Sequence, residues 1–194
     1  MARPWRLASG RGAGATPGRR SALIMPDARL TVTGATALPV RDLGRYIYEP
    51  AGAVIRAGAI AELGERLGAG LLDSQVAYLT SDQLHDTPFA TAFEVRQQLP
   101  ANLKALRKWV RQAEVGVLEI KKRGVDIDPA VLRKAAANWG PNSATIVISR
   151  RRTGIIVALV ERRSDWIRPA GRDVSLTRAA MRSSPNRDVA RLSP

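Results

Sequence analysis

The sequence predicts an α+β fold, a small sandwich in which a mostly antiparallel sheet carries helices on one face. Three observations predict it. From Ala90 onward, the patterns typical of strands and helices follow the order β-α-β-α-β-β. Hydrophobic residues make up 45% of the 194 residues, enough for a packed core, and the absence of Cys excludes disulfides and Cys-based metal sites. Helices that alternate with antiparallel strands in this way pack on one side of the sheet.

The first half of the chain contains short elements. We expect strands at 21–25 and 29–33, a helix at 54–67, and strands at 75–79 and 90–95. In the helix, Ile60, Leu63 and Leu67 share one face. Glu62 lies between them in the sequence and is expected on the outer, solvent-facing side.

The second half contains the clearest helix, Leu103–Ala113, which begins after Asn102. Its apolar stripe is formed by Leu103, Leu106, Val110 and Ala113, and its other faces carry Lys104, Arg107, Lys108 and Arg111. A strand is expected at 115–121, a helix at 128–138, and a hairpin at 145–160 with a basic tip. Asp128 followed by Pro129 is typical of a helix start.

Positive charge is concentrated in the second half. The formal net charge is +14. Residues 101–163 hold fourteen basic and five acidic residues, whereas residues 41–100 hold five basic and eight acidic ones. This asymmetry indicates one binding face for a polyanion, most simply nucleic acid. No apolar run is long enough to cross a membrane, and the polar arm 1–17 and tail 164–194 are predicted to be disordered.

A run of three cations gives the most specific site prediction. Lys121, Lys122 and Arg123 end a predicted strand and lead into Gly124, a plausible phosphate cradle. The assisting contacts are predicted to be Lys104, Lys108, Arg111, Arg150, Arg151 and Arg152. A solvated strand end is the alternative interpretation of the run. The prediction requires that residues 121–123 are not held in ion pairs away from the other cations.

Other motifs favour ordinary structural roles. The run Gly10–Ala15 fits a dinucleotide fingerprint loosely, but no strand precedes it, so a flexible arm is favoured. His85 has no accompanying nucleophile motif and is expected in a surface loop. Asp126 and Asp128 can hold Mg²⁺, but a helix cap explains Asp128 without a metal. Trp109 and Trp139 can stack on bases, although core packing is the commoner role. We therefore expect no catalytic residue and no metal site.

Four sequence blocks carry a family resemblance. They are Gly44–Gly58, Ala77–Asp82, Thr87–Phe89 and Leu118–Pro129, in that order. Together with the Asn102–Arg111 helix, they resemble the THUMP-like C-terminal domain of bacterial, mostly actinobacterial, class I S-adenosylmethionine-dependent methyltransferases. The resemblance covers about Arg45–Val160. Ala51 departs from the family pattern, which has Asp there, and Arg96-Gln97-Gln98 replaces a more apolar strand end.

The resemblance implies a division of the chain. Residues 18–44 would be the remnant of the end of a methyltransferase domain and its linker, and residues 45–163 the THUMP-like domain. On this division, most of the methyltransferase domain would be absent from this chain. The chain alone is therefore expected to be non-catalytic and to bind no cofactor, whereas the full-length family uses S-adenosylmethionine.

The resemblance also implies a function. The domain would bind RNA, tRNA in particular, in the cytoplasm and present it to the methyltransferase domain of the parent protein, with no membrane involved. One alternative is the RNA methyltransferase activity of the family itself. The other is a docking module without RNA binding, which would use Tyr46, Tyr48, Glu49 and Pro50 as its docking face.

Overall fold

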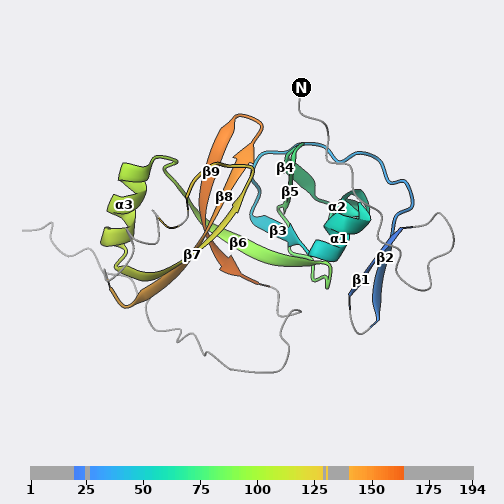
Figure 1. Cartoon of the computed structure of the whole chain (residues 1–194), viewed down its shortest axis with the longest axis horizontal. Coiled ribbons are helices and arrows are strands. Elements are labelled where there is room, and N and C mark those ends of the chain that lie inside the picture. The colour runs from blue at the N-terminus through green and yellow to red at the C-terminus, as the bar shows by residue number, and fades with distance from the viewer. Residues whose placement is uncertain (1–19, 25–26, 129, 131–139, 164–194) are drawn as a thin grey trace, which may run out of the picture.

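The computed structural model of the chain describes residues 20–24, 27–128, 130 and 140–163 (Figure 1). The predicted arm 1–17, the tail 164–194, Trp139 and nearly all of the predicted 128–138 helix lie outside these residues. The glycine run at 10–15 lies outside them as well.

The described residues form two sheets and three helices. The elements, in chain order, are β1 (Ser21–Ile24), β2 (Ala28–Thr31), β3 (Tyr46–Pro50), α1 (Gly52–Ala57), α2 (Ile60–Arg66), β4 (Gly70–Asp73), β5 (Val76–Ser81), β6 (Ala90–Leu99), α3 (Leu103–Gln112), β7 (Val115–Arg123), β8 (Asn142–Arg151) and β9 (Gly154–Arg162). β1 and β2 pair as a separate hairpin. The remaining strands form one sheet in the order β4-β5-β3-β6-β9-β8-β7. All neighbouring strands are antiparallel except β7 and β8. The predicted α+β class is confirmed.

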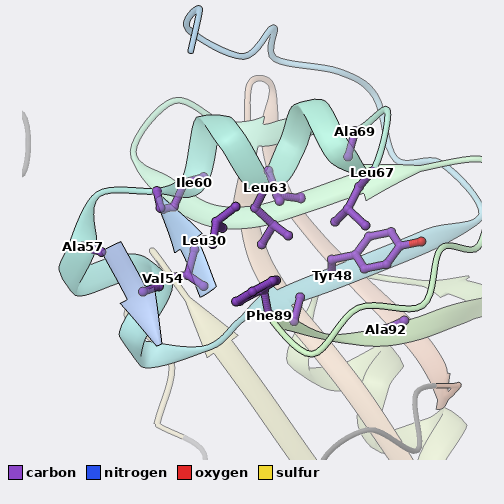
Figure 2. Close-up of a cluster of buried hydrophobic side chains, with 14 of the residues drawn as sticks. Leu30, Tyr48, Val54, Ala57, Ile60, Leu63, Leu67, Ala69, Phe89 and Ala92 are labelled. Atoms are coloured by element: carbon purple, nitrogen blue, oxygen red, sulfur yellow. The ribbon is translucent and has the colours of Figure 1, made fainter. Parts of the chain in front are cut away.

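All three helices cover the same face of the large sheet. Figure 2 shows Leu63 of α2 above Phe89, and Leu67, which directly follows α2, above Tyr48 of β3. Leu30 of the hairpin belongs to the same cluster. Further along the sheet, Leu106 and Val110 of α3 pack on residues of β7, β8 and β9 in a second cluster. The strand registers place both sets of sheet residues on one side. The prediction of helices on one face is therefore correct.

The opposite face of the sheet is buried by its own curvature. Ile47, Tyr78, Phe93 and Val147 come from four different strands and form a third cluster that includes no helix residue. The sheet curls so strongly that β4 and β5 at one edge approach β8 and β7 at the other. Gly124 follows β7, and a Cβ there would lie only 2.6 Å from Val76 of β5. The edge strands do not pair with each other, so the sheet stays open.

Several elements differ from the sequence prediction. The expected 54–67 helix is two helices, because Gly58 adopts a left-handed conformation with φ of 72° and ends α1. Ile60, Leu63 and Leu67 are buried as predicted, but Glu62 is buried too, only 6% exposed. Strands β3 and β4 were not predicted. β3 has no clean alternation, since four of its five residues are buried.

The helix and hairpin of the second half match their predictions closely. The Asn102 side chain accepts a hydrogen bond from the Ala105 backbone nitrogen at 2.8 Å, which caps α3. β8 and β9 pair up to Arg151 and Gly154, and Gly154 has a φ of 106° that suits the tight turn.

Candidate nucleic-acid interface

Helix α3 presents a row of cations to solvent. Lys104, Arg107, Lys108 and Arg111 are all exposed. Their spacing of three, four and seven residues places them on one side of the helix, opposite the buried Leu106 and Val110. They were expected on several faces, and Arg107 was not among the predicted contacts. Helical spacing alone would have shown that all four share a face.

Three cations of this row, Lys104, Arg107 and Lys108, are not neutralised in the way that Lys121 and Arg123 of β7 are. No ion pair involves Lys104, Arg107 or Lys108 within the part of the chain that the structure describes. From the first to the last member, seven residues at about 1.5 Å per residue give a length of about 10 Å. We name the four residues Lys104, Arg107, Lys108 and Arg111 the α3 row. The α3 row is a concentrated positive surface.

The predicted main contacts at 121–123 are divided between the two faces of the sheet. Strand geometry points Lys121 and Arg123 to one face and Lys122 to the other. The Lys121 ammonium lies 3.0 Å from a carboxylate oxygen of Glu49 on β3, and the Arg123 guanidinium lies 3.5 Å from the other. Two of the three cations therefore face a carboxylate inside the curled sheet, against the requirement that they be free of ion pairs.

Aromatic rings complete the surroundings of these two cations. The Lys121 ammonium lies 5.4 Å from the centre of the Phe93 ring, and the Arg123 guanidinium lies 5.2 Å from that of Tyr78. Burial, with the Glu49 carboxylate nearby, raises the pKa of Tyr78 to about 12 although Arg123 opposes the change. The side chain of Lys121 is only 19% exposed. This arrangement is that of a structural cluster, which joins the edge strand β7 to β3, β5 and β6.

Lys122 and the hairpin tip remain nearer to solvent. Lys122 is exposed, and its ammonium donates a hydrogen bond to the Ile127 carbonyl at 2.8 Å. At the tip, Arg150 donates to the side chain of Gln75 at 3.1 Å, Arg151 is half-buried and Arg152 is exposed. The RNA contacts predicted at Lys122 and at these three arginines stay predictions. Of the three arginines at the tip, Arg152 is the one that is exposed and not bonded to Gln75 as Arg150 is.

A second cluster of ion pairs neutralises arginines that contribute to the positive net charge. Glu94 is 5% exposed and pairs with Arg45, Arg96 and Arg163. Burial alone would raise the pKa of Glu94, but the hydrogen bonds from Arg163 and Arg45 and the charge of Arg96 lower it overall. Glu161 also contacts Arg96 and Arg163. These arginines hold β3, β6 and β9 together.

The residues predicted to form a docking face are largely inaccessible. Tyr46 and Tyr48 are 8% and 0% exposed, Pro50 is buried, and Glu49 is engaged with Lys121 and Arg123. The Tyr48 hydroxyl donates to the Gln83 carbonyl at 2.9 Å and accepts from the His85 backbone nitrogen at 2.8 Å. β3 is a central strand of the sheet. The docking role of these four residues stays a prediction.

The remaining candidates have structural surroundings. Asp128 accepts a hydrogen bond from the Ala130 backbone nitrogen at 2.8 Å, as a helix cap does. No group of three or more metal-ligating side chains occurs among the described residues. His85 lies half-buried in the loop between β5 and β6, and Trp109 is half-buried against the cluster under α3.

Comparison with known proteins finds a family-model match in the second half of the chain. Residues 90–162, from β6 to β9, match the family model described as THUMP domain-like. Two curated relatives, from Mycobacterium tuberculosis strains CDC 1551 and H37Rv, are each 40% identical over 111 residues, 57% of this chain and 30% of the relative. Both are described as uncharacterized S-adenosylmethionine-dependent methyltransferases.

A solved structure supports the fold. A proposed methyltransferase from Porphyromonas gingivalis W83 superimposes with a TM-score of 0.60 at 23% identity, covering 74% of this chain and 37% of that one. Residues 90–162 thus match the THUMP domain-like model, and part of the chain is similar to part of proteins described as S-adenosylmethionine-dependent methyltransferases, which confirms the resemblance. It spans less than a third of the length of its curated relatives. No helix among the described residues could span a membrane.

Proposed function

We propose that this chain is an RNA-binding module, with tRNA as its substrate, that presents the RNA to an S-adenosylmethionine-dependent methyltransferase domain in the cytoplasm. The observation that carries the proposal is the α3 row, whose exposed cations lie together on a helix of the THUMP domain-like region. The surface offers charge and no base-reading pattern, so recognition would act through the sugar-phosphate backbone and the shape of the RNA.

The site proposed from the structure differs in emphasis from the one proposed from the sequence. The α3 row makes the main phosphate contacts, and Lys122 and Arg152 assist from the sheet and the hairpin tip. Lys121 and Arg123 stabilise the curled sheet instead, because their charges are already met by Glu49. Each phosphate neutralised releases counterions, so binding should weaken steeply as salt rises.

The described residues do not fit S-adenosylmethionine. The turns that lead into the described helices α1 and α3 follow the strands β3 and β6. The first carries a single glycine, Gly52, beside the guanidinium of Arg56, and the second carries Pro100 and no glycine. Neither is the glycine-rich loop that lets a backbone approach a nucleotide-type cofactor. We propose that methyl transfer belongs to a separate domain.

A salt titration tests the proposed site. Lys104, Arg107 and Lys108 are replaced together by Ala, and tRNA binding is measured by fluorescence anisotropy at several salt concentrations. We expect the affinity to fall and the slope of log K against log salt to decrease by about 2–3, since each phosphate contact contributes about 0.7–0.9.

A matched control removes the same charge elsewhere. Arg20, Arg29 and Arg56 are exposed and lie at the end of the molecule that carries the hairpin and α1 (Figure 1). Their replacement by Ala should leave the slope close to that of the parent. An equal loss of slope in both triple variants would mean that only net charge matters. An unchanged slope in the α3 variant would overturn the proposed site.

A further inference from the structure

The segment between the hairpin and the large sheet, residues 33–41, is fixed to α2 rather than free. The Glu62 carboxylate accepts hydrogen bonds from three consecutive backbone nitrogens, those of Thr33, Gly34 and Ala35, at 2.8, 3.2 and 3.3 Å. Gly34 has a φ of 85°, a conformation that helps consecutive N–H groups to converge on one anion. One turn further along α2, Glu65 accepts from the Thr36 backbone nitrogen at 3.3 Å.

Glu62 is held by these backbone groups and not by a cation. The residue is 6% exposed, and no ion pair involves it in the part of the chain that the structure describes. A buried carboxylate is costly unless its charge is met by hydrogen bonds. Three of the groups that stabilise the Glu62 charge belong to residues 33–35, beside the backbone N–H of Glu62 itself, so most of this stabilisation is present only while that segment stays in place.

The rest of the segment is packed just as closely. Leu38 lies against Gly64 of α2, where an added Cβ would be 2.1 Å from a Leu38 methyl carbon. Leu71 of β4 donates its backbone N–H to the Pro39 carbonyl at 2.9 Å and accepts from that of Arg41 at 2.8 Å. At the other end, Ala22 and Leu30 bury the hairpin in the cluster beneath α1 and α2. The segment 33–41 is therefore held by contacts at both of its ends and in its middle.

We propose that Glu62 is a latch that sets the orientation of the hairpin relative to the large sheet and the α3 row. By holding the backbone of residues 33–35, it turns a connecting segment into a rigid support. The use of this rigidity rests on the proposed function: a domain associated with the hairpin would meet RNA bound at the α3 row at one fixed distance and angle.

Pulsed electron paramagnetic resonance tests the latch directly. The chain has no cysteine, so spin labels at Leu23→Cys on β1 and Val117→Cys on β7 are unique; the two parent side chains are 48% and 66% exposed. The labelled full chain should give one narrow distance distribution. Adding Glu62→Gln should broaden it or create a second population, because an uncharged amide holds three N–H donors less strongly.

A matched control and a second measurement complete the test. Glu65→Gln alters a carboxylate that holds a single exposed backbone group, and should keep the parental distribution. Hydrogen exchange at residues 33–35 should accelerate about tenfold or more in Glu62→Gln, as expected for a weakened charge-assisted hydrogen bond. Identical distributions in the parent and Glu62→Gln would overturn the latch.

The design separates this inference from the proposed function. If Glu62→Gln does not fold, hydrogen exchange at residues 33–35 of the parent protein tests the latch instead. Slow exchange would support the latch, and exchange as fast as in an unstructured chain would overturn it. Binding of tRNA is measured on the same proteins. A parent that fails to bind tRNA but shows the distance change would remove the proposed function and leave the latch standing.

Discussion

Replacing Lys121 with Ala should lower the stability of the fold and leave RNA binding almost unchanged. The substitution removes the ion pair with Glu49 at 3.0 Å and the contact with the Phe93 ring at 5.4 Å. The side chains of Lys121 and Glu49 are 19% and 24% exposed, so solvent screens the pair only in part. We assign about 1 kcal/mol to it and about 0.5–1 kcal/mol to the ring contact. Glu49 keeps Arg123 as a partner.

Thermal unfolding followed by circular dichroism measures this loss. A decrease of about 1.5–2 kcal/mol in the free energy of unfolding should lower Tm by about 3–8 °C in a protein of this size. In a tRNA titration the same variant should differ from the parent by less than about twofold, because Lys121 faces the interior of the curled sheet and Glu49 already meets its charge.

The neighbouring Lys122→Ala is the matched control. This substitution also removes a lysine side chain, but one that lies on the opposite face of the strand and is exposed to solvent. Its unfolding free energy should stay within about 0.5 kcal/mol of the parent, whereas its tRNA affinity should fall. Our reasoning would be refuted if Lys121→Ala kept the parental Tm and weakened tRNA binding about tenfold.

Three further predictions concern the rest of the molecule. The pKa values of Glu62 and Glu94 are lowered in the folded state, so their contribution to stability is present above the unfolded value near 4.3 and is lost as the pH falls through the lower folded pKa; urea unfolding from pH 7 to pH 3 measures this. Gly64→Ala should destabilise the fold by about 1–3 kcal/mol in urea despite better helix propensity, because Leu38 occupies the space of the new methyl group. Tyr48→Phe should cost about 1–3 kcal/mol and speed hydrogen exchange in the loop at 82–88, because its hydroxyl bridges two backbone groups there; parental exchange in that variant would contradict the bridge.

Local patterns were sufficient to predict the elements whose causes are local. Helix α3 was predicted correctly because its cap at Asn102 and its apolar stripe lie within a dozen residues. The β8–β9 hairpin was predicted for the same reason, since two β-rich runs flank a short turn with Gly154. Strand β3 was missed because its residues are buried on both faces of a central strand, which removes the alternation that identifies a half-exposed strand.

The roles of the charged residues depend on contacts that no local pattern contains. Glu62 has the position of an outward-facing helix residue, but its donors lie 27 to 29 residues earlier in the chain. Lys121 and Arg123 resemble part of an exposed basic run, and alternation along a strand could have separated them from Lys122. Their partner Glu49 lies on β3, and only the curling of the sheet brings β7 back to it. The location of the counter-charges is therefore a property of the fold.

Because of this distribution of counter-charges, the cations of the basic half differ in how exposed and how paired they are. Two carboxylates each pair with more than one cation: Glu49 of β3 with two from β7, and Glu94 of β6 with three from different parts of the chain. These pairs convert part of the positive excess into connections between strands. Among the described residues, Lys104, Arg107 and Lys108 of α3 are exposed and take part in no ion pair with another described residue, so their charge is available to a polyanion. In such a protein, stability and binding depend on different cations. Substitution of exposed cations on α3 should not destabilise the sheet. Substitution of the paired cations should destabilise the sheet without altering the electrostatic field that RNA would meet. The opposite responses expected of Lys121→Ala and of the triple substitution on α3 follow from that separation.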